Sequence, residues 1–430
     1  MDQAAGIWSH CLEYAALSDI GLRRSNNQDS YKVVLAGDEA DFQQRGHLFI
    51  VADGMGAHAA GELASKIATD VIPLDYRKLV DQSPAEAILS ALVDANHQIH
   101  TRGQASPEFR GMGTTATALL LLPVGALLAH VGDSRGYRLR GNRIEQLTFD
   151  HSLVWEMKAS GQMPEGELST FVPKNIITRS LGPNPTVHVD IEGPHPVATG
   201  DTFLLCSDGL SGQVADDEIG LILNCLPPNE AAQALIDVAC LRGGPDNITV
   251  AVVRVAGSQV PRPTESRVSG SRVKSRAQPV HPLIWTALGV TLLASAGLFA
   301  LGQPLLGAIA GLVAVAAGAI GLMQRYGGSS EPAPDDRHFG RGPYVAADCA
   351  PNADLLTRLA ELVKQLREAT LDATVAVDRA PCDTLLAQAA TAAKAGNLAD
   401  AARGHLRAII SLMSQLRAHQ PASSDSSVFL

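Results

Sequence analysis

The sequence predicts an α+β fold with antiparallel sheets over about residues 12–256, and the order of its apolar segments is the main reason. Short apolar runs come in groups and do not alternate strictly with helices, which favours antiparallel sheets over a parallel α/β sheet. Helical spacing of apolar residues predicts two helices between the runs, at 60–72 and 83–100. The runs predicted as strands are 47–52, 117–122, 126–131, 202–207 and 248–255.

The composition is that of a globular chain with an acidic balance. Of 430 residues 46% are hydrophobic and 4% aromatic, so the cores must be mostly aliphatic, and the length favours two or three domains. A formal charge of −10 argues against general nucleic-acid binding, which needs a concentrated basic face. The 6 cysteines are scattered without a CxxC pair, which indicates reduced, buried thiols of a cytosolic protein. The N-terminal residues lack the charged and apolar regions of a signal peptide.

A basic linker and two uncharged segments follow the first unit. Residues 257–282 are rich in Pro, Ser and Gly and carry several Arg residues, which predicts a flexible linker. Residues 283–302 and 305–323 contain no charged residue, and each segment is long enough to span a bilayer. They predict a transmembrane helical hairpin over 283–323, and a buried helical hairpin is the alternative.

The charges around this hairpin predict its orientation. Basic residues precede the first span and Arg325 follows the second, whereas the connecting turn is uncharged. By the positive-inside rule both flanks lie in the cytoplasm. We therefore expect a multi-pass protein of the cytoplasmic (inner) membrane, with the first unit and the C-terminal tail in the cytoplasm. Gly307 and Gly311 would allow close helix packing, or they reflect a Gly/Ala-rich composition alone.

The C-terminal tail, 350–420, is predicted to be helical. A break at Gly396 separates two later helices, which together resemble one tetratricopeptide unit. A single unit of that kind cannot bury its own apolar face. The tail therefore forms a small helical bundle or docks a protein partner, and both alternatives stay open. One apolar stripe of the tail is formed by Leu355, Leu359, Leu362 and Leu366.

Four carboxylates stand at the edges of predicted strands. Asp53, Asp133 and Asp208 follow apolar runs, and Asp246 immediately precedes one. An Asp-Gly pair alone usually marks a turn, but several converging carboxylates repel one another unless a cation lies between them. Carboxylate and carbonyl oxygens without matching His or Cys favour Mg²⁺ or Mn²⁺ over Zn²⁺. A pair of such ions can generate a nucleophile from water and neutralise a phosphate.

Six segments, taken in order, resemble one known family. The segments are RRSNNQDS, VADGMGAHAAGE, GMGTTATAL, HVGDSRGYRL, LLCSDGLSG and GGPDNITV. Together they resemble the bacterial metal-dependent serine/threonine protein phosphatases of the PPM (type 2C) family, over about residues 12–256. The resemblance implies a four-layer α-β-β-α sandwich of two antiparallel sheets, with the metal ions at one end.

The resemblance also implies a set of metal ligands. Asp53 would bridge two Mg²⁺ or Mn²⁺ ions, and Gly54 would lend its backbone carbonyl to one of them. Asp208 and Asp246 would complete this tightly held pair. Asp133, together with Asp208, would hold a possible third ion more weakly.

Three further positions take their implied functions from the same resemblance. Asp29 would act on the metals through bound water, and Arg24 would bind the substrate phosphate. Residues 151–182 resemble the mobile flap that shapes substrate access. Met55 follows the first Asp-Gly pair, where some relatives have a histidine proposed as general acid, so the proton for the leaving group must come from water or another group.

The implied activity is hydrolysis of phosphoserine and phosphothreonine in proteins. Hydroxide bridging the two ions would attack the phosphate, with Asp53 and Asp208 acting through that metal-bound water. The implied partners are phosphorylated proteins, among them a Ser/Thr kinase and its substrates at the same membrane. The alternative is a catalytically weak or inactive PPM-fold binding module with an adaptor tail, although no metal-site aspartate is lost.

Overall fold

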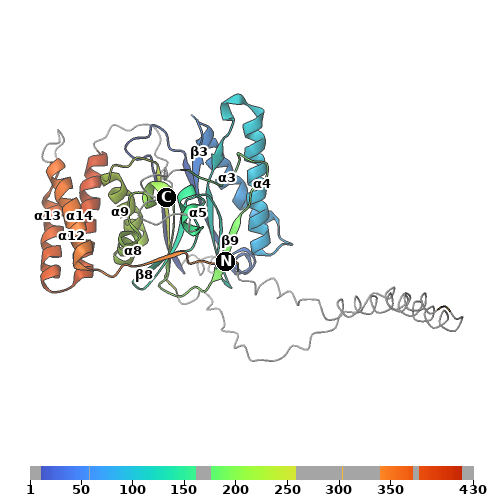
Figure 1. Ribbon diagram of the computed structural model, residues 1–430. Helices are drawn as coiled ribbons and strands as arrows, with labels where there is room; N and C mark the ends of the chain where they lie inside the picture. Colours follow the sequence, from blue (N-terminus) through green and yellow to red (C-terminus); the bar gives the residue numbers. More distant parts are fainter. Residues whose placement is uncertain are drawn as a thin grey trace, which may run out of the picture. The chain divides into compact units, whose positions relative to one another are not determined.

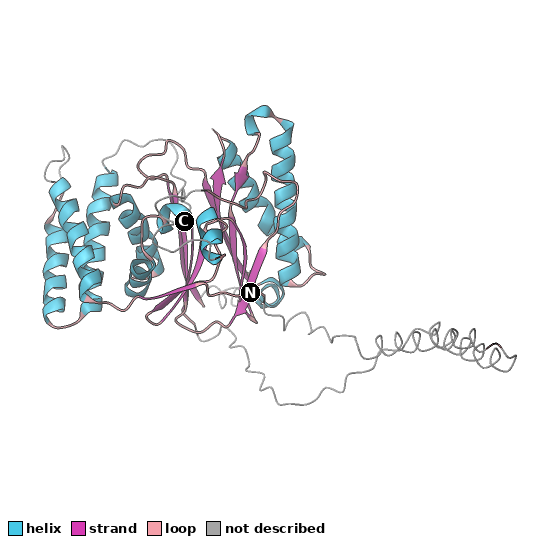
Figure 2. Cartoon of the chain, in the orientation of Figure 1, coloured by secondary structure: helices cyan, strands magenta, loops and turns pink. Residues whose placement is uncertain are grey.

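Two stacked antiparallel sheets form the centre of the fold (Figures 1 and 2). The structure is a computed structural model that describes residues 11–57, 59–160, 176–257, 339–370 and 377–418, together with Gln303. The first sheet has the strand order β1 (Leu12–Asp19), β11 (Ile248–Val255), β10 (Thr202–Cys206), β7 (Arg135–Arg140), β8 (Arg143–Gln146) and β12 (Val345–Asp348). The second sheet has the order β2 (Asp29–Val34), β3 (His47–Met55), β5 (Ala116–Leu122), β6 (Gly125–Val131) and β9 (Asp190–His195), with β4 (Gly113–Thr114) beside β3.

Side-chain alternation along the strands separates the core into layers. In β3, Phe49 and Val51 point into the space between the two sheets. Leu48 and Ile50, one residue out of step, belong to the core under the helices of the second sheet. Because successive side chains of a strand point to opposite faces, a strand buried on both faces reads as a continuous apolar run. This is why the sequence marks β3, β5, β6, β10 and β11 clearly.

Helices cover the outer face of each sheet (Figure 2). Helices α3 (Ala60–Lys78) and α4 (Pro84–Ala105) pack on the second sheet, and α8 (Asp216–Cys225) and α9 (Pro228–Leu241) pack on the first. The start of α4 is fixed by a capping box between Ser83 and Glu86. The four-layer sandwich implied by the resemblance is therefore confirmed. Shorter helices are α2 (Glu39–Arg45), η1 (Pro107–Phe109), α5 (Leu153–Ala159) and α7 (Asp208–Ser211).

The described C-terminal residues, 339–370 and 377–418, belong to the same compact unit as the described part of residues 11–257. Strand β12 pairs with β8 and so extends the first sheet by one strand. Helices α12 (Ala353–Ala369), α13 (Ala380–Lys394) and α14 (Leu398–Ala418) follow it. The predicted leucine stripe is buried in the core that also contains α8 and α9, with Leu362 partly exposed. The apolar face that the sequence left without a partner is thus covered within this chain.

The predicted transmembrane hairpin is corrected by the structure. Among the helices of the described residues, none combines the length and apolar character that crossing a membrane requires. The long helices there are amphipathic: α12, for example, has charged residues such as Asp354 and Arg358 opposite its buried leucines. This finding overturns the predicted hairpin and the predicted multi-pass location in the cytoplasmic membrane, and both predictions are wrong for the described fold. The proposed spans, 283–302 and 305–323, and most of the linker 257–282 lie outside the described residues.

Candidate active site

Five aspartates gather at one end of the two sheets. Asp29, the first residue of β2, pairs in register with Asp53 of β3. Asp208 begins α7 directly after β10, and Asp133 and Asp246 lie within two residues of β6 and β11. Burial, and then repulsion by the other four carboxylates, raises the pKa of Asp53 well above its usual range. The structure therefore brings the predicted aspartates close enough for their charges to interact.

The carboxylates of this cluster are buried, and few hydrogen bonds offset the loss of their hydration. Burial raises the pKa of Asp29 to about 7 and that of Asp133 to about 7. Burial and repulsion by Asp246 also raise the pKa of Asp208. The Oδ1 atoms of Asp29 and Asp133 are buried without a hydrogen-bond partner. Buried like charges of this kind need either protons or a cation.

The donor chemistry of the cluster fits Mg²⁺ or Mn²⁺. The side chains supply oxygen donors alone, and hard divalent cations prefer such donors. Two orphaned carboxylate oxygens, on Asp29 and Asp133, are free to accept a ligand bond. As the side chains stand, no group of three or more His, Cys, Asp or Glu in the described part of the chain could hold a metal ion. The assignment of Mg²⁺ or Mn²⁺ to this cluster thus rests on the chemistry of its donor atoms and on the repulsion between its carboxylates.

Gly54 occupies a position where the backbone leaves no room for a side chain. A Cβ atom there would lie 2.1 Å from the carbonyl oxygen of Gly61 and 2.5 Å from that of Gln28. The Gly54 N–H also donates to the Gln28 carbonyl at 3.1 Å. The close packing explains why this residue is glycine. Its function as a carbonyl ligand stays a prediction.

Two threonines of the segment GMGTTATAL, Thr114 and Thr115, hold Asp53 in place. The Asp53 N–H donates to Thr115 Oγ1 at 2.9 Å, and the Thr115 N–H donates to the Asp53 carbonyl at 2.8 Å. Thr114 Oγ1 donates to the same carbonyl at 2.9 Å. Thr115 Oγ1 also lies 2.7 Å from Ser134 Oγ, beside Asp133. Thr115 therefore connects the supports of two of the clustered aspartates.

Arg24 reaches the cluster from the loop between β1 and β2. Its Nη2 lies 2.6 Å from Asp246 Oδ2, and 49% of its side chain is exposed. Asn247 fixes this loop: its Nδ2 donates to the carbonyls of Ile20 and Asn26, and its Oδ1 accepts from the Gln28 N–H. The sequence reading missed Asn247, although a polar residue between Asp246 and a buried strand was a signal for such a position.

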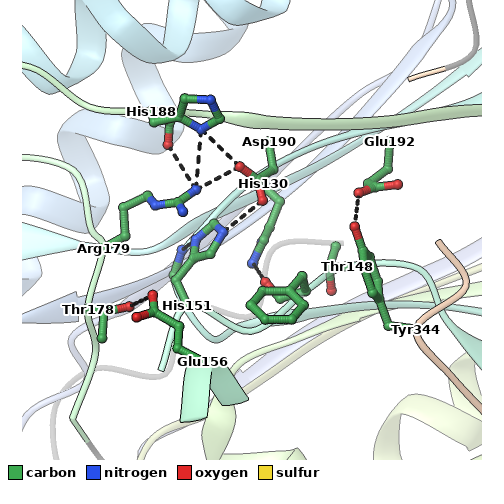
Figure 3. Close-up of polar contacts among 12 residues, drawn as sticks. His130, Thr148, His151, Glu156, Thr178, Arg179, His188, Asp190, Glu192 and Tyr344 are labelled. Atoms are coloured by element: carbon green, nitrogen blue, oxygen red, sulfur yellow. Dashed lines mark hydrogen bonds and ion pairs between the residues drawn. The ribbon is translucent and has the colours of Figure 1, made fainter. Parts of the chain in front are cut away.

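The base of the predicted flap is tied to the sandwich by a polar network (Figure 3). His151 Nδ1 accepts from the Gly132 N–H at 2.9 Å, which leaves Nε2 to donate to Asp190 at 2.9 Å. Arg179 contacts the other oxygen of Asp190 at 2.6 Å. Both nitrogens of His151 are therefore used in positioning. Residues 161–175 of the flap lie outside the described residues.

His130 is also held by contacts of both its ring nitrogens with neighbouring groups. Its Nδ1 lies 2.9 Å from Thr117 Oγ1 and its Nε2 lies 3.0 Å from the Phe149 carbonyl. Burial lowers its pKa to about 3, so the ring is neutral at physiological pH. Figure 3 shows its ring beside that of His151, among the residues of the network. Neither histidine is free to exchange protons with a substrate.

Comparison with known proteins agrees with the fold. A sequence model described as Protein phosphatase 2C matches residues 23–238. The chain is 38% identical over 242 residues to a putative protein phosphatase 2C-type of Streptococcus pyogenes, a match that covers 55% of this chain and 94% of that protein. It is 38% identical over 248 residues to protein phosphatase PhpP of Streptococcus pneumoniae, covering 56% and 97%. The match to serine/threonine protein phosphatase PstP of Mycobacterium tuberculosis, 38% over 251 residues, covers 57% of this chain and 45% of PstP.

Solved structures show the same sandwich. The crystal structure of the M. tuberculosis phosphatase PstP/Ppp matches with a TM-score of 0.50 and 35% identity, over 57% of this chain and 99% of that chain. The S. agalactiae serine/threonine phosphatase matches with a TM-score of 0.50 and 37% identity, over 57% and 99%. An α-β-β-α sandwich with aspartates clustered at one end defines a metal-dependent phosphatase, and this chain belongs to the protein phosphatase 2C (PPM) family. The predicted family and the predicted enzyme class, serine/threonine phosphatase, are confirmed.

Proposed function

We propose that this chain hydrolyses phosphoserine and phosphothreonine in proteins with the help of two Mg²⁺ or Mn²⁺ ions. The observation that carries the proposal is the buried aspartate cluster around Asp53, whose carboxylates repel one another. Relatives named serine/threonine phosphatases support the substrate class. The family is metal-dependent, which supports the cofactor.

We assign the ligands as the resemblance to the PPM family implies. Asp53 would be shared between the two ions, and Asp208, Asp246 and the Gly54 carbonyl would complete their protein ligands. Asp133 would serve a weaker third ion together with Asp208. When bound, the ions supply a nucleophile from water at neutral pH and neutralise the phosphate charge.

The chain's own residues orient the substrate and the water. Arg24 is half exposed and already bonded to Asp246, so it can turn its remaining N–H groups towards a phosphate oxygen. Asp29 accepts from Ser207 Oγ at 2.7 Å through Oδ2, which leaves Oδ1 to accept a hydrogen bond from water. Asp53 and Asp208, deprotonated when the ions are bound, would hold the ions that activate the attacking water.

The proposal for the natural substrates rests on the names of the relatives. Relatives named serine/threonine phosphatases point to phosphorylated proteins, and a Ser/Thr kinase together with its substrates fits that description. Incubating the full chain with a phosphorylated kinase domain and measuring the loss of phosphate would test this assignment. Retention of the phosphate, while a small substrate is hydrolysed, would contradict it.

The proposal is tested with the full chain, Mn²⁺ and two substrates, para-nitrophenyl phosphate and a phosphothreonine peptide. We expect hydrolysis that requires the metal and is lost in the Asp208→Asn variant. Activity no greater than that of this variant would refute the proposed function. The second candidate is a binding module without activity, favoured by the absence of a ready metal-ligand group among the described residues. It predicts phosphopeptide binding without hydrolysis.

A further inference from the structure

Helix α14 lies against the catalytic sandwich, beside α9 (Figure 1). Leu406, Ile409 and Leu412 of α14 are fully buried in the core that also contains α9. Two arginines of α14 reach across to α9. Arg407 pairs with Glu230 at 2.6 Å, and both side chains are partly exposed at 44% and 30%. Arg417, near the end of α14, makes a more buried contact.

Arg417 meets a carboxylate that is completely buried. Its Nη1 lies 2.6 Å from Asp237 Oδ1, and the Asp237 side chain has 0% exposure. Gln233 Nε2 donates to the same oxygen at 3.0 Å, while Asp237 Oδ2 has no hydrogen-bond partner. A buried carboxylate with so few donors depends strongly on its cation. The last turns of α14 are therefore held on α9 by a charge pair as well as by apolar packing.

The other arm of the Arg417 guanidinium points towards the start of the loop that carries Arg24. Its Nη2 lies 3.6 Å from Asp19 Oδ2, at the end of β1. The Oδ1 atom of Asp19 accepts from the Gly21 N–H at 2.8 Å. Arg417 thus bridges α9 and the first turn of this loop. A planar guanidinium can contact two carboxylates at once, which a lysine ammonium does less well.

This turn is packed directly on the segment that carries Asp246. Gly21 has a φ of +76°, and a Cβ atom there would lie 2.2 Å from the Asp246 carbonyl oxygen. The Leu22 N–H donates to the Gly244 carbonyl at 2.8 Å. Any shift at Asp19 is therefore passed to the two segments that bring Arg24 and Asp246 together.

We propose that Arg417 is a positioning residue for Arg24, the arginine that binds the substrate phosphate. Helix α14 of the C-terminal segment is then required for normal substrate binding. The inference rests on the proposed function, because it concerns the geometry of Arg24. Arg417 acts through Asp19 and the turn at Gly21 and does not touch the substrate.

The experiment compares Arg417→Lys, Arg417→Ala and the control Arg407→Ala in the full chain. Arg407→Ala removes an ion pair between the same two helices, but that pair has no link to Asp19. Arg417→Lys keeps a cation for Asp237, so the fold is retained while the bridge to Asp19 is lost. For the Arg417 variants we expect the KM for para-nitrophenyl phosphate to rise about tenfold with kcat changed less than about threefold. We also expect amide exchange at Gly21 and Leu22 to accelerate about tenfold.

Asp19→Asn supplies an independent second test. The amide oxygen can still accept from the Gly21 N–H, but the charge that faces Arg417 is gone. If the bridge acts as proposed, this variant reproduces the effect of Arg417→Lys, and combining the two adds little.

The outcomes separate this proposal from the proposed function. A lower melting temperature with KM and loop exchange equal to those of Arg407→Ala would overturn the positioning function, since Arg417 would then only neutralise Asp237. Should the unmodified chain show no hydrolysis, the proposed function fails. The hydrogen exchange of Gly21 and Leu22 still decides whether Arg417 holds the loop.

Discussion

Replacing Asp133 by Asn should make the stability of the metal-free chain less sensitive to a rise in pH from 5 to 8. The Asp133 side chain is 7% exposed, and its Oδ1 has no hydrogen-bond partner. Burial, followed by repulsion from Asp208, raises its pKa to about 7. The folded state therefore prefers the protonated acid, while the unfolded chain ionises near its ordinary pKa. Asparagine has nearly the same shape and does not ionise.

The size of the effect follows from the shift. The pKa in the folded state, about 7, lies roughly 3 units above the ordinary value of 3.8, and one unit corresponds to about 1.4 kcal/mol. The contribution to stability is complete below pH 3.8 and is lost as the pH rises through 7. In total the loss is about 4 kcal/mol, of which about 1.6 kcal/mol has occurred by pH 5. Between pH 5 and pH 8 the variant should therefore gain about 2–3 kcal/mol relative to the unmodified chain.

The assay is urea unfolding of both proteins after EDTA treatment, at pH 5, 6, 7 and 8. Burying an asparagine amide adds a cost of about 1–3 kcal/mol that does not depend on pH, so the test is the change in the difference with pH and not its absolute value. Added Mn²⁺ should stabilise the unmodified chain more than the Asp133→Asn variant. Stability curves that run parallel within about 0.5 kcal/mol over this range would refute the reasoning.

Three further predictions concern the support of the site. Arg24→Lys keeps the positive charge but loses the paired N–H groups, so the KM for a phosphopeptide should rise about tenfold with a smaller change in kcat. Steady-state kinetics measures this effect, with Arg23→Lys as the control variant. Thr115→Val removes the hydroxyl that accepts from the Asp53 N–H. The affinity for Mn²⁺, measured by calorimetry, should therefore fall about tenfold, and the free energy of unfolding should fall by about 1–3 kcal/mol. An unchanged affinity would show that Thr115 does not position Asp53. Gly54→Ala puts a Cβ 2.1 Å from a carbonyl oxygen, so the variant should be about 1–3 kcal/mol less stable and its melting temperature several degrees lower. A melting temperature like that of Gly37→Ala, where the nearest atom would lie 4.0 Å from the new Cβ, would contradict the packing argument.

The parts of the fold that the sequence predicted are those encoded by neighbouring residues. Strand β3 and its partners are buried on both faces, so their apolar runs stand out without knowledge of the tertiary structure. Asp53 and Asp208 were found because each ends such a run. The resemblance to a known family then supplied the four-layer arrangement, which the local pattern alone left open.

The supports of the site were harder to predict because they join residues far apart in the chain. Thr115 lies 62 residues from Asp53, and Asn247 lies 219 residues from Gln28. Threonine and asparagine are common in turns, so their sequence gives little sign of a buried partner. The membrane hairpin was predicted from a local signal alone, a run of uncharged residues. No helix of the described residues is long and apolar enough to cross a membrane.

The C-terminal segment shows why a domain boundary drawn from composition is a poor guide for experiments on this chain. The change of composition after residue 257 suggests that the phosphatase could be cut there. Yet β12 completes the edge of the first sheet beside β8, and α14 buries its apolar side in the core that includes α9. Removing both would expose that apolar face to water and take away the cation beside Asp237. Exposing such a face weakens a domain, because apolar burial supplies a large part of its stability. Low activity in a truncated chain would therefore say nothing about the aspartate cluster, and the full chain is the form in which the catalytic proposal can be judged.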